Sequence, residues 1–425
     1  MRIVNRDHGA GVTAKTVPAA EASGPEGSLR SRRRGRRGAV VAGLAVGAVA
    51  AVAAPTTAFA ATASGFGPPN ASPVVGHVYV NDNTPGVNTI AAFNRHANGS
   101  LTPEPGSPFV AGGAGTGAEL ASQGSLQIAP GGRFLLAADA GSNQVSVLAI
   151  RPDGSLQLVP HGITASGGML PVSIAVHGDL VYVANSGSGG SNFTGFRLGL
   201  GGQLAPVAGS TVTLPGNAQP GDVLFNGTGT SLVGTLVGTS QIASFTVGAS
   251  GRLTAAPGSP ITAQGLGPFG SEFRPTDPSQ LFVSNAHNVG AGTGTVSAFF
   301  DSPRGVLASI GHSPFADQQT APCWVQISQD GRFLFTVNTG SGNISRYAIT
   351  PAGTLILLGT TPIRGAGGPG AVDAGLSPDG RTLYVNESEG NVVGAFAVSG
   401  GNLTELPSSP VALPAGATAA GMAVS

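Results

Sequence analysis

One strand-and-turn pattern recurs seven times along this chain and constrains the fold more than any other feature. Each copy contains a short hydrophobic strand, and the centres of successive strands are 47 to 56 residues apart. These strands cover residues 78–81, 134–136, 181–185, 232–233, 281–285, 333–338 and 383–386. Because a unit of this size cannot bury an apolar face alone, the period predicts repeats that pack side by side around or along a common axis.

Two further landmarks follow each hydrophobic strand in a fixed order. The first is a stretch in which small and apolar residues alternate, as at 144–147 and 295–299, which is typical of a β-strand. The second is a turn followed by a leucine, and a Ser-Pro or related turn comes five to seven residues later. The leucines are Leu101, Leu156, Leu204, Leu253, Leu307, Leu355 and Leu403. Each copy therefore predicts several short antiparallel strands joined by Gly, Asn and Asp turns.

A fourth element precedes the hydrophobic strand in copies two to seven, for example at 172–176 and 324–328, but it is missing before Val78. Residues 421–425 match this element at the other end of the chain. We therefore predict an all-β, seven-bladed β-propeller with four antiparallel strands per blade, closed by a C-terminal strand that completes the first blade. An open β-solenoid is the alternative, although solenoids need no such closing strand.

The first 60 residues differ from the rest of the chain. A basic run at 30–37 is followed by an apolar stretch at 39–54 and by the Ala-Phe-Ala pattern at 58–60. This order is typical of an export signal, with cleavage after Ala60. We therefore expect an export signal and basic leader at 1–60, a linker at 61–72 and the propeller at 73–425. The protein would be secreted or held in the cell envelope after export by the Sec or twin-arginine route, and an N-terminal membrane anchor is the alternative.

Loss of residues 1–60 would change the charge of the protein. Eleven basic and 17 acidic residues remain, which gives a net charge of −6, and every remaining basic residue is arginine. The only lysine of the chain is Lys15, so Schiff-base chemistry is excluded in the mature protein, and an acidic surface is a poor match for nucleic acid. The single cysteine, Cys323, excludes an intrachain disulfide.

The Tyr-Val-x-Asn strands, the Ser-Pro-Asp-Gly-Arg turn at 377–381 and the Asp-Gly-Ser-Leu turn at 153–156 resemble the lactonase-type seven-bladed propellers. This family includes bacterial 6-phosphogluconolactonases and muconate-lactone cyclases, and it overlaps the Tyr-Val-Thr-Asn repeat proteins. The resemblance extends from about residue 73 to 425, and it implies a lactone hydrolase or a lactonising isomerase. Members that act on lactones carry His, Arg and Glu at the channel mouth, often directly after a proline that opens an inner strand. In this chain the prolines are present, but Val172, Gly221 and Phe269 follow them.

In the connectivity of this family, two of the four loops of each blade lie on one face of the ring. Nine carboxylates fall on or near this face, and Arg364 is the only arginine among them. The nine are Asp82, Glu119, Asp139, Asp222, Glu272, Asp317, Asp373, Glu387 and Glu389. The resemblance therefore implies an acidic channel mouth, which would attract a divalent cation, a cationic ligand or a neutral polyol and repel anionic lactones. Ordinary solvation of one face is the alternative.

Two residues are candidates for catalysis: His287 as a general base and Arg364 as a cationic stabiliser. Trp324 could stack on a sugar, or it could pack between blades. The asparagines at the strand ends could bind a ligand or form turns. The full set of predicted ligand-binding residues is Asp139, Asp222, Glu272, Trp324, Asp373, Glu387, Asn185, Asn285, Asn338 and Asn386.

The sequence leaves two functions open. The first is a non-catalytic, extracytoplasmic ligand-binding or scaffold protein that uses the acidic channel mouth. The alternative is a divergent lactone hydrolase of the carboxylic ester hydrolase class, or a lactonising isomerase. Expected partners are a small molecule, a carbohydrate or another protein, without nucleic acid and without a membrane span after cleavage. We expect a monomer, and a divalent cation in the channel mouth is the candidate cofactor.

Overall fold

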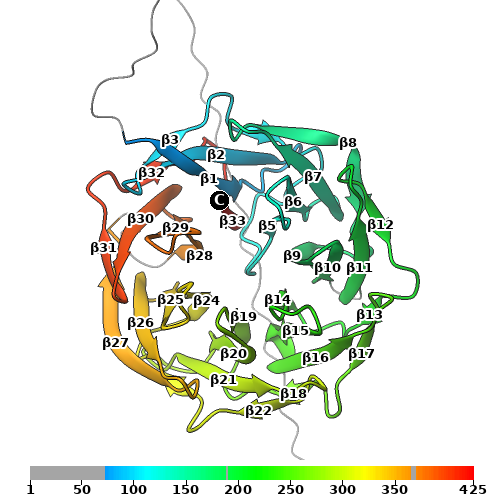
Figure 1. Ribbon diagram of the computed structural model, residues 1–425, viewed down its shortest axis with the longest axis vertical. Helices are drawn as coiled ribbons and strands as arrows, with labels where there is room; N and C mark the ends of the chain where they lie inside the picture. Colours follow the sequence, from blue (N-terminus) through cyan, green and yellow to red (C-terminus); the bar gives the residue numbers. More distant parts are fainter. Residues whose placement is uncertain (1–71, 188–189, 365–369) are drawn as a thin grey trace, which may run out of the picture. The chain divides into compact units, whose positions relative to one another are not determined.

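The computed structural model describes residues 72–187, 190–364 and 370–425. They form seven antiparallel sheets arranged in a ring, which confirms the predicted propeller (Figure 1). The described residues belong to one compact unit. The predicted export signal at 1–60 and nearly all of the predicted linker at 61–72 lie outside the described residues, and these boundaries stay predictions.

Blades are numbered from the first hydrophobic strand, and the strands of each are given from the channel outward. Blade 1 contains β33 (Gly421–Val424), β1 (Val74–Asn81), β2 (Thr89–His96), β3 (Leu101–Pro103) and β4 (Phe109–Val110). Blade 2 contains β5 (Leu126–Ile128), β6 (Phe134–Asp139), β7 (Gln144–Ile150) and β8 (Leu156–Ala165). Blade 3 contains β9 (Pro171–His177), β10 (Leu180–Asn185), β11 (Asn192–Leu198), β12 (Leu204–Pro206) and β13 (Val212–Thr213).

Blade 4 contains β14 (Pro220–Phe225), β15 (Ser231–Leu236), β16 (Gln241–Val247), β17 (Leu253–Ala255) and β18 (Ile261–Thr262), with the short 3-10 helix η1 (Val237–Thr239) after β15. Blade 5 contains β19 (Pro268–Arg274), β20 (Asp277–Asn285), β21 (Thr295–Asp301), β22 (Leu307–Ser309) and β23 (Phe315–Ala316). Blade 6 contains β24 (Pro322–Ile327), β25 (Phe333–Asn338), β26 (Asn343–Ile349) and β27 (Leu355–Pro362). Blade 7 contains β28 (Ala371–Leu376), β29 (Thr382–Glu387), β30 (Val392–Ser399), β31 (Asn402–Glu405) and β32 (Val411–Ala412).

The predicted closing strand is confirmed. β33 pairs antiparallel with β1, so that Val424 lies opposite Val78 and Gly421 opposite Asn81. Figure 1 shows the red end of the chain beside the first blue strand. The two ends of the propeller thus share one sheet, and β33 covers the inner edge of β1.

The outermost strand is split into two short pieces in five blades, and in four of these the Ser-Pro landmark lies at the split. The Ser107 hydroxyl accepts the N–H of Ala92 at 2.8 Å, and the hydroxyls of Ser259, Ser313 and Ser409 make the same bond in their own blades. These hydroxyls bond main-chain N–H groups that the split leaves without a strand partner. A short, interrupted outer edge is also a poor template for pairing with another chain.

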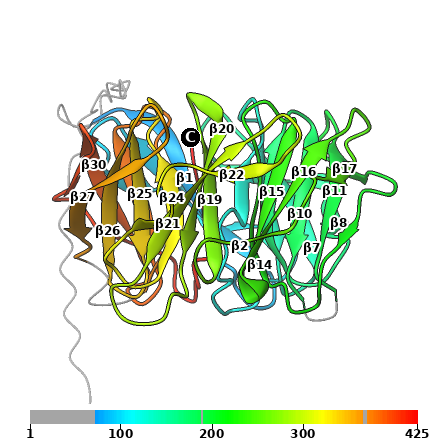
Figure 2. The same ribbon diagram turned by 90° about the horizontal axis from the view of Figure 1, so that it is seen from below.

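Packing between neighbouring blades forms the core. One position of the third strand illustrates this, because it carries a large apolar side chain in every blade and is nearly inaccessible to solvent. The residues are Phe93, Leu148, Phe196, Phe245, Phe299, Tyr347 and Phe396. Figure 2 shows the ring from its edge, with the strands of each blade running between its two faces. Loops and turns on the two faces therefore surround a rigid, apolar framework.

The tyrosine of the Tyr-Val motif connects each of three blades to the next. The Tyr79 hydroxyl donates to the Gly154 carbonyl oxygen at 3.0 Å, Tyr182 donates to Gly251 at 2.7 Å and Tyr384 donates to Gly99 at 2.9 Å. All three tyrosines are fully buried. The tyrosine thus fills the interface between blades with its ring and satisfies a turn carbonyl of the next blade with its hydroxyl.

We expect Tyr182→Phe to lower the free energy of unfolding by about 1 kcal/mol, because the buried Gly251 carbonyl loses its donor while the ring remains. Denaturant unfolding followed by circular dichroism measures the difference. Leu200→Ala is the matched control, since Leu200 is 90% exposed and should leave stability unchanged. Equal stability of Tyr182→Phe and the unaltered protein would show that the hydroxyl does not stabilise this interface.

Candidate functional site at the central channel

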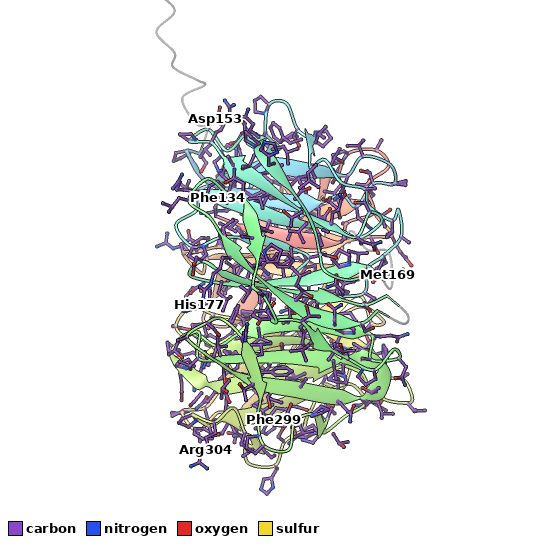
Figure 3. The ribbon with its side chains drawn as sticks, turned by 90° about the vertical axis from the view of Figure 1, so that its right-hand side faces the viewer. Phe134, Asp153, Met169, His177, Phe299 and Arg304 are labelled. Carbon is purple, nitrogen blue, oxygen red and sulfur yellow. The ribbon has the colours of Figure 1, made fainter. Side chains whose placement is uncertain are left out.

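The loops lie on two distinct faces of the ring. The mouth face carries the loops that enter the inner strands and the loops that join the second and third strands; Asn88 N donates to Gly113 O at 2.7 Å and links one loop of each kind. The far face carries the turns between the first two strands and the last two strands. In the edge-on view of Figure 3, Met169 of a mouth loop lies on one side, while Asp153, His177 and Arg304 lie on the other.

The plug segment, residues 120–124, crosses the channel at the mouth. It precedes β5 of blade 2, yet Ser122 donates its hydroxyl to Val172 O of blade 3, and Gln123 N donates to Gly221 O of blade 4. The Gln123 carboxamide donates to Ser271 O of blade 5 and accepts from Val325 N of blade 6, both at 3.0 Å. Figure 1 shows this cyan loop reaching toward the middle of the ring. The channel mouth is therefore crossed by the protein's own chain.

The plug segment was not predicted from the sequence, although a signal was present. The first two hydrophobic strands are 56 residues apart, which is the longest spacing in the repeat. The extra residues fall in the loop between β4 and β5, and this loop contains the plug segment.

The structure contradicts the prediction that Trp324 stacks on a ligand. The side chain is 2% exposed, and its indole Nε1 donates to Ser122 O of the plug segment at 2.9 Å. Its ring packs edge-to-face against Phe269, with centroids 5.1 Å apart. Trp324 thus bonds the plug segment through its indole N–H and packs against Phe269 of blade 5, as the alternative of packing between blades predicts.

We expect Gln123→Ala to loosen the plug, because the variant removes two hydrogen bonds that reach across the channel. Trp324 is the only tryptophan of the chain, so its fluorescence reports on the plug directly. The emission maximum should shift to longer wavelength and acrylamide should quench it more efficiently. Gln329→Ala, at an exposed glutamine in the far-face turn after β24, is the matched control and should change neither property. Unchanged emission in Gln123→Ala would show that the plug stays in place without this side chain.

Three of the predicted ligand-binding carboxylates join the inner strands to one another. An inner strand has one edge without a strand partner, and its N–H groups need acceptors. Asp222 accepts from Ser271 N at 3.0 Å, Glu272 from Ile327 N at 2.7 Å and Asp373 from Met422 N at 2.7 Å, each in the next blade. These carboxylates therefore act as links between blades around the channel wall.

Burial changes the acidity of these three groups. It raises the pKa of Asp222 and of Asp373 to about 7, and the pKa of Glu272 to about 8. Hydrogen bonds from the neighbouring main chain, and from two serines at Asp222, offset only part of this effect. Near neutral pH, a large fraction of these carboxyls therefore carries a proton and no charge.

The register places a second set of polar residues at the ends of the second strands. The prediction for Asn386 is corrected by this register. In blade 6, Asn338 pairs with the first residue of the third strand, and in blade 7 the residue that does so is Glu387. Asn386 lies one residue before this position. The equivalent residues around the ring are Asp82, Asp139, Asn185, Leu236, Asn285, Asn338 and Glu387.

The polar members of this set are fully buried. Asn285 Nδ2 donates to Ser297 Oγ at 2.9 Å, Asn338 Nδ2 donates to Ser345 Oγ at 2.8 Å, and Asp139 accepts from Ser146. Asn185 donates to Asn192 Oδ1 at 2.8 Å. These side chains bond side chains of the third strand in their own blades, and Asp139 also accepts from Asn88 of blade 1 at 2.9 Å. They are therefore engaged within the protein and not exposed to a ligand.

Glu387 is the exception in this set. The positions that supply hydroxyl groups in other blades are held by Val392 and Gly394 in blade 7, and neither carboxylate oxygen of Glu387 has a partner among the described residues. Gly394 lies directly against it, because a Cβ on residue 394 would lie 2.5 Å from Glu387 Oε1. Burial, and to a lesser degree Glu405, raises the pKa of Glu387 to about 7.

The channel mouth exposes fewer acidic side chains than the sequence predicted. Six of the nine carboxylates are buried, namely Asp82, Asp139, Asp222, Asp317, Asp373 and Glu387. In the described propeller, eight acidic residues and two arginines are buried, while nine of each are partly or fully exposed. The excess of six carboxyl groups over arginines therefore lies inside the protein, where burial raises the pKa of several of them to about 7 and so reduces their charge at neutral pH. The sequence placed the carboxylates near one face, but these six side chains turn inward. There Asp222 and Asp373 accept from main-chain N–H groups, and Asp82, Asp139 and Asp317 accept from side chains.

The two predicted catalytic residues are not brought together. His287 is exposed in the loop after β20, beside Gly267. Arg364 follows β27, and its guanidinium Nε donates to Glu405 Oε2 at 2.9 Å. No hydrogen bond or ion pair joins His287 to Arg364 in the described part of the chain. Each therefore lacks the second catalytic group that a shared site would provide.

A metal site is not formed by the side chains of the described propeller. Among these residues, no group of three or more His, Cys, Asp or Glu side chains is placed to hold a metal ion. The predicted divalent cation therefore has no ligand cluster in this part of the chain. No helix within residues 72–187, 190–364 and 370–425 is long and apolar enough to cross a membrane.

Comparison with known proteins agrees with this architecture. Residues 216–417 match a family model described as "Lactonase, 7-bladed beta-propeller". The periplasmic gluconolactonase of Pseudomonas aeruginosa is 19% identical, with a TM-score of 0.63 over 82% of this chain and 98% of that one. A Bacteroides uniformis protein provisionally assigned as a 6-phosphogluconolactonase is 20% identical, with a TM-score of 0.64 over 82% and 99%. No curated protein matches the sequence significantly. The predicted family resemblance is confirmed, and likeness at these identities shows the fold.

Proposed function

We propose that this chain, which is a seven-bladed β-propeller of the lactonase family, is a non-catalytic ligand-binding or scaffold protein outside the cytoplasm. The plug segment is the observation that carries the proposal. It bonds the inner strands of blades 3, 4, 5 and 6 and so crosses the mouth through which a lactone would reach the channel. A channel blocked by several hydrogen bonds suits a scaffold better than an enzyme that exchanges substrate and product.

The side chains at the mouth support the same function. General acid–base catalysis needs a group within hydrogen-bond reach of the reacting atom and a second group that orients it. His287 has no such orienting partner among the described residues, and Arg364 is already paired with Glu405. The prolines that open the inner strands are not followed by the His or Arg of lactone-hydrolysing relatives.

A lactone panel tests this proposal. Purified protein is incubated with phosphorylated, carboxylated and neutral sugar lactones, with and without Mg²⁺, Ca²⁺ and Mn²⁺, and ring opening is followed by pH-stat titration. We expect no rate above the uncatalysed one. Gln123→Ala, with its loosened plug, should be equally inactive. Turnover that is lost in His287→Ala or Arg364→Ala would overturn the proposal.

A lactone hydrolase or lactonising isomerase is the second candidate, and Glu387 is the observation that favours it. A buried carboxyl without a hydrogen-bond partner in the described propeller, with its pKa raised by burial to about 7, is the kind of group that enzymes use as a general acid or base near neutral pH. If the panel reveals an activity, Glu387→Gln should abolish it, while the exposed Glu389→Gln should leave it intact. Equal activity of the two variants would remove this role for Glu387.

The proposed place of action rests on the N-terminal sequence, which is typical of an export signal. We propose cleavage after Ala60 and release into the cell envelope or the medium. N-terminal sequencing of protein recovered from an exporting host should begin at Ala61. Recovery of the intact N-terminus from the membrane fraction would favour an anchor instead.

A further inference from the structure

Blade 5 breaks the repeat at two adjacent positions of its third strand, β21. The residue after the buried aromatic position is small or polar in the other blades, as Asn94, Ala149, Arg197, Thr246, Ala348 and Ala397. The next residue is aliphatic in five of them, as Ile150, Leu198, Val247, Ile349 and Val398. In blade 5 these two positions hold Phe300 and Asp301.

Phe300 and Asp301 are both unfavourable for stability at these positions, because one exposes an apolar ring and the other buries a carboxyl group. Phe300 is 46% exposed, whereas the equivalent residues present polar or small side chains to solvent. Asp301 is 5% exposed, and its Oδ1 has no hydrogen-bond partner among the described residues. In blade 1 the equivalent Arg95 is also buried, but it donates to Ser425 O and Val75 O. An exposed phenyl ring and an unsatisfied buried carboxylate oxygen both cost stability, and such local violations are expected where a protein binds something.

Phe300 and Asp301 line a pocket of about 300 Å³ between blades 4 and 5. Asn226 and Thr228, of the first turn in blade 4, form the opposite wall, and Ser302 continues the wall from blade 5. This junction lies on the far face, the same side as Arg304 in Figure 3. The pocket thus combines one apolar ring with amide, hydroxyl and carboxylate groups.

Similar pockets occur at two other junctions of the far face. One lies between blades 6 and 7 and is lined by Phe333, but the Arg332 guanidinium lies 5.2 Å from the centre of that ring and pairs with Asp330. Another lies between blades 1 and 2, beside His77 and Asp153. The geometry of the fold therefore creates a recess at these junctions. In blade 5 the recess has gained a half-exposed aromatic ring and is lined by Asp301, whose Oδ1 is buried without a hydrogen-bond partner among the described residues.

This combination of groups favours a sugar over other ligands. A pyranose ring has one face of C–H groups that packs on an aromatic ring, and its hydroxyl groups can donate to a carboxylate and bond with amides and hydroxyls. The Asp301 carboxyl would disfavour an acidic sugar, because like charges repel at short range. A single neutral pyranose unit is of the right size for a pocket of about 300 Å³.

We propose that the pocket between blades 4 and 5 binds a neutral pyranose unit of a saccharide, with Phe300 against the sugar's apolar face and Asp301 accepting from its hydroxyl groups. This inference rests on the proposed binding role, but it uses the far face and not the channel. It gives a function to Phe300 and Asp301, the two residues at which blade 5 departs from the repeat.

Saturation-transfer difference NMR with the methyl pyranosides of glucose, galactose, mannose and fucose tests the site on the mature protein. We expect at least one of them to bind. Two variants restore the residues of blade 4: Phe300→Thr matches Thr246, and Asp301→Val matches Val247. Each should weaken binding at least tenfold, while Leu200→Ala, an exposed residue of blade 3, should leave it unchanged.

Thermal melting separates a binding role from a structural one. Asp301→Val should melt at the same temperature or higher, because it removes a buried carboxyl, whose Oδ1 has no hydrogen-bond partner among the described residues, from a position that is aliphatic in five other blades. No saturation transfer from any of the four pyranosides would overturn the proposal, as would binding that survives in both variants. The lactone panel gives an independent result: no turnover and no sugar binding would remove this site and leave the proposed non-catalytic role intact.

Discussion

Removing Gly421–Ser425 should open the ring and lower stability more than any single substitution at the channel or between the blades. β33 supplies the innermost strand of blade 1 and pairs with β1 over four residues. Without it, Asp373 loses the N–H of Met422, and Arg95 loses the Ser425 carbonyl that its Nε bonds at 2.9 Å. Two buried ionisable side chains and the edge of β1 would be left without these partners.

We expect the truncated protein to melt on the order of 10 °C lower, or to fail to accumulate in folded form. Differential scanning calorimetry and limited proteolysis measure the change. Removal of Ser425 alone takes away its bonds with Arg95 and His77 but keeps β33, so it separates the two causes and should lower the melting temperature by less than the five-residue truncation. A five-residue truncation that melts and resists protease like the full chain would show that β33 does not hold the ring closed.

The melting temperature should fall as the pH rises from 5 to 8.5. Burial raises the pKa values of Asp222 and Asp373 to about 7, of Glu272 to about 8 and of Glu387 to about 7, all above the ordinary value near 4. The folded protein therefore holds these protons more tightly than the unfolded chain. Their contribution to stability is complete below about pH 4 and is lost as the pH rises through the raised pKa values.

Between the pKa of a group in the unfolded chain and its higher pKa in the folded protein, each pH unit lowers the free energy of unfolding by about 1.4 kcal/mol. The combined fall in melting temperature should be on the order of 5 °C or more. Glu387→Gln removes one titrating group without removing a hydrogen bond, because this carboxyl has no partner in the described part of the chain. The variant should be more stable than the unaltered protein at pH 8.5 and similar at pH 5. The exposed Glu389→Gln is the control, and stability that rises from pH 5 to 8.5 would contradict the prediction.

Much of the fold could be predicted from the sequence because its cause is local and repeated. Alternation of apolar residues within each copy predicts strands, and seven copies at one period predict the blades. The closing strand was also predictable, since the element missing before Val78 is present at Met422. An error of one residue placed Asn386 at a strand end that belongs to Glu387, because two polar residues follow Tyr384-Val385 and only the pairing with β30 separates them.

The candidate site was less predictable, because it depends on where side chains point and on contacts between distant segments. The sequence placed Asp222 and Asp373 near one face, but only the neighbouring inner strands show that they bond Ser271 N and Met422 N. Trp324 and Ser122 are 202 residues apart, and no local pattern predicts that the plug segment covers the indole.

The sequence by itself therefore determined the number of blades, their strand order and the closure of the ring, since these follow from hydrophobic periodicity within each repeat. The tertiary structure alone decided which charges are exposed, what fills the channel and where a ligand could bind. The physical reason is that a buried polar group must find its partner in space, and in a ring that partner belongs to the next blade, about 50 residues away, or to a loop reaching across the channel.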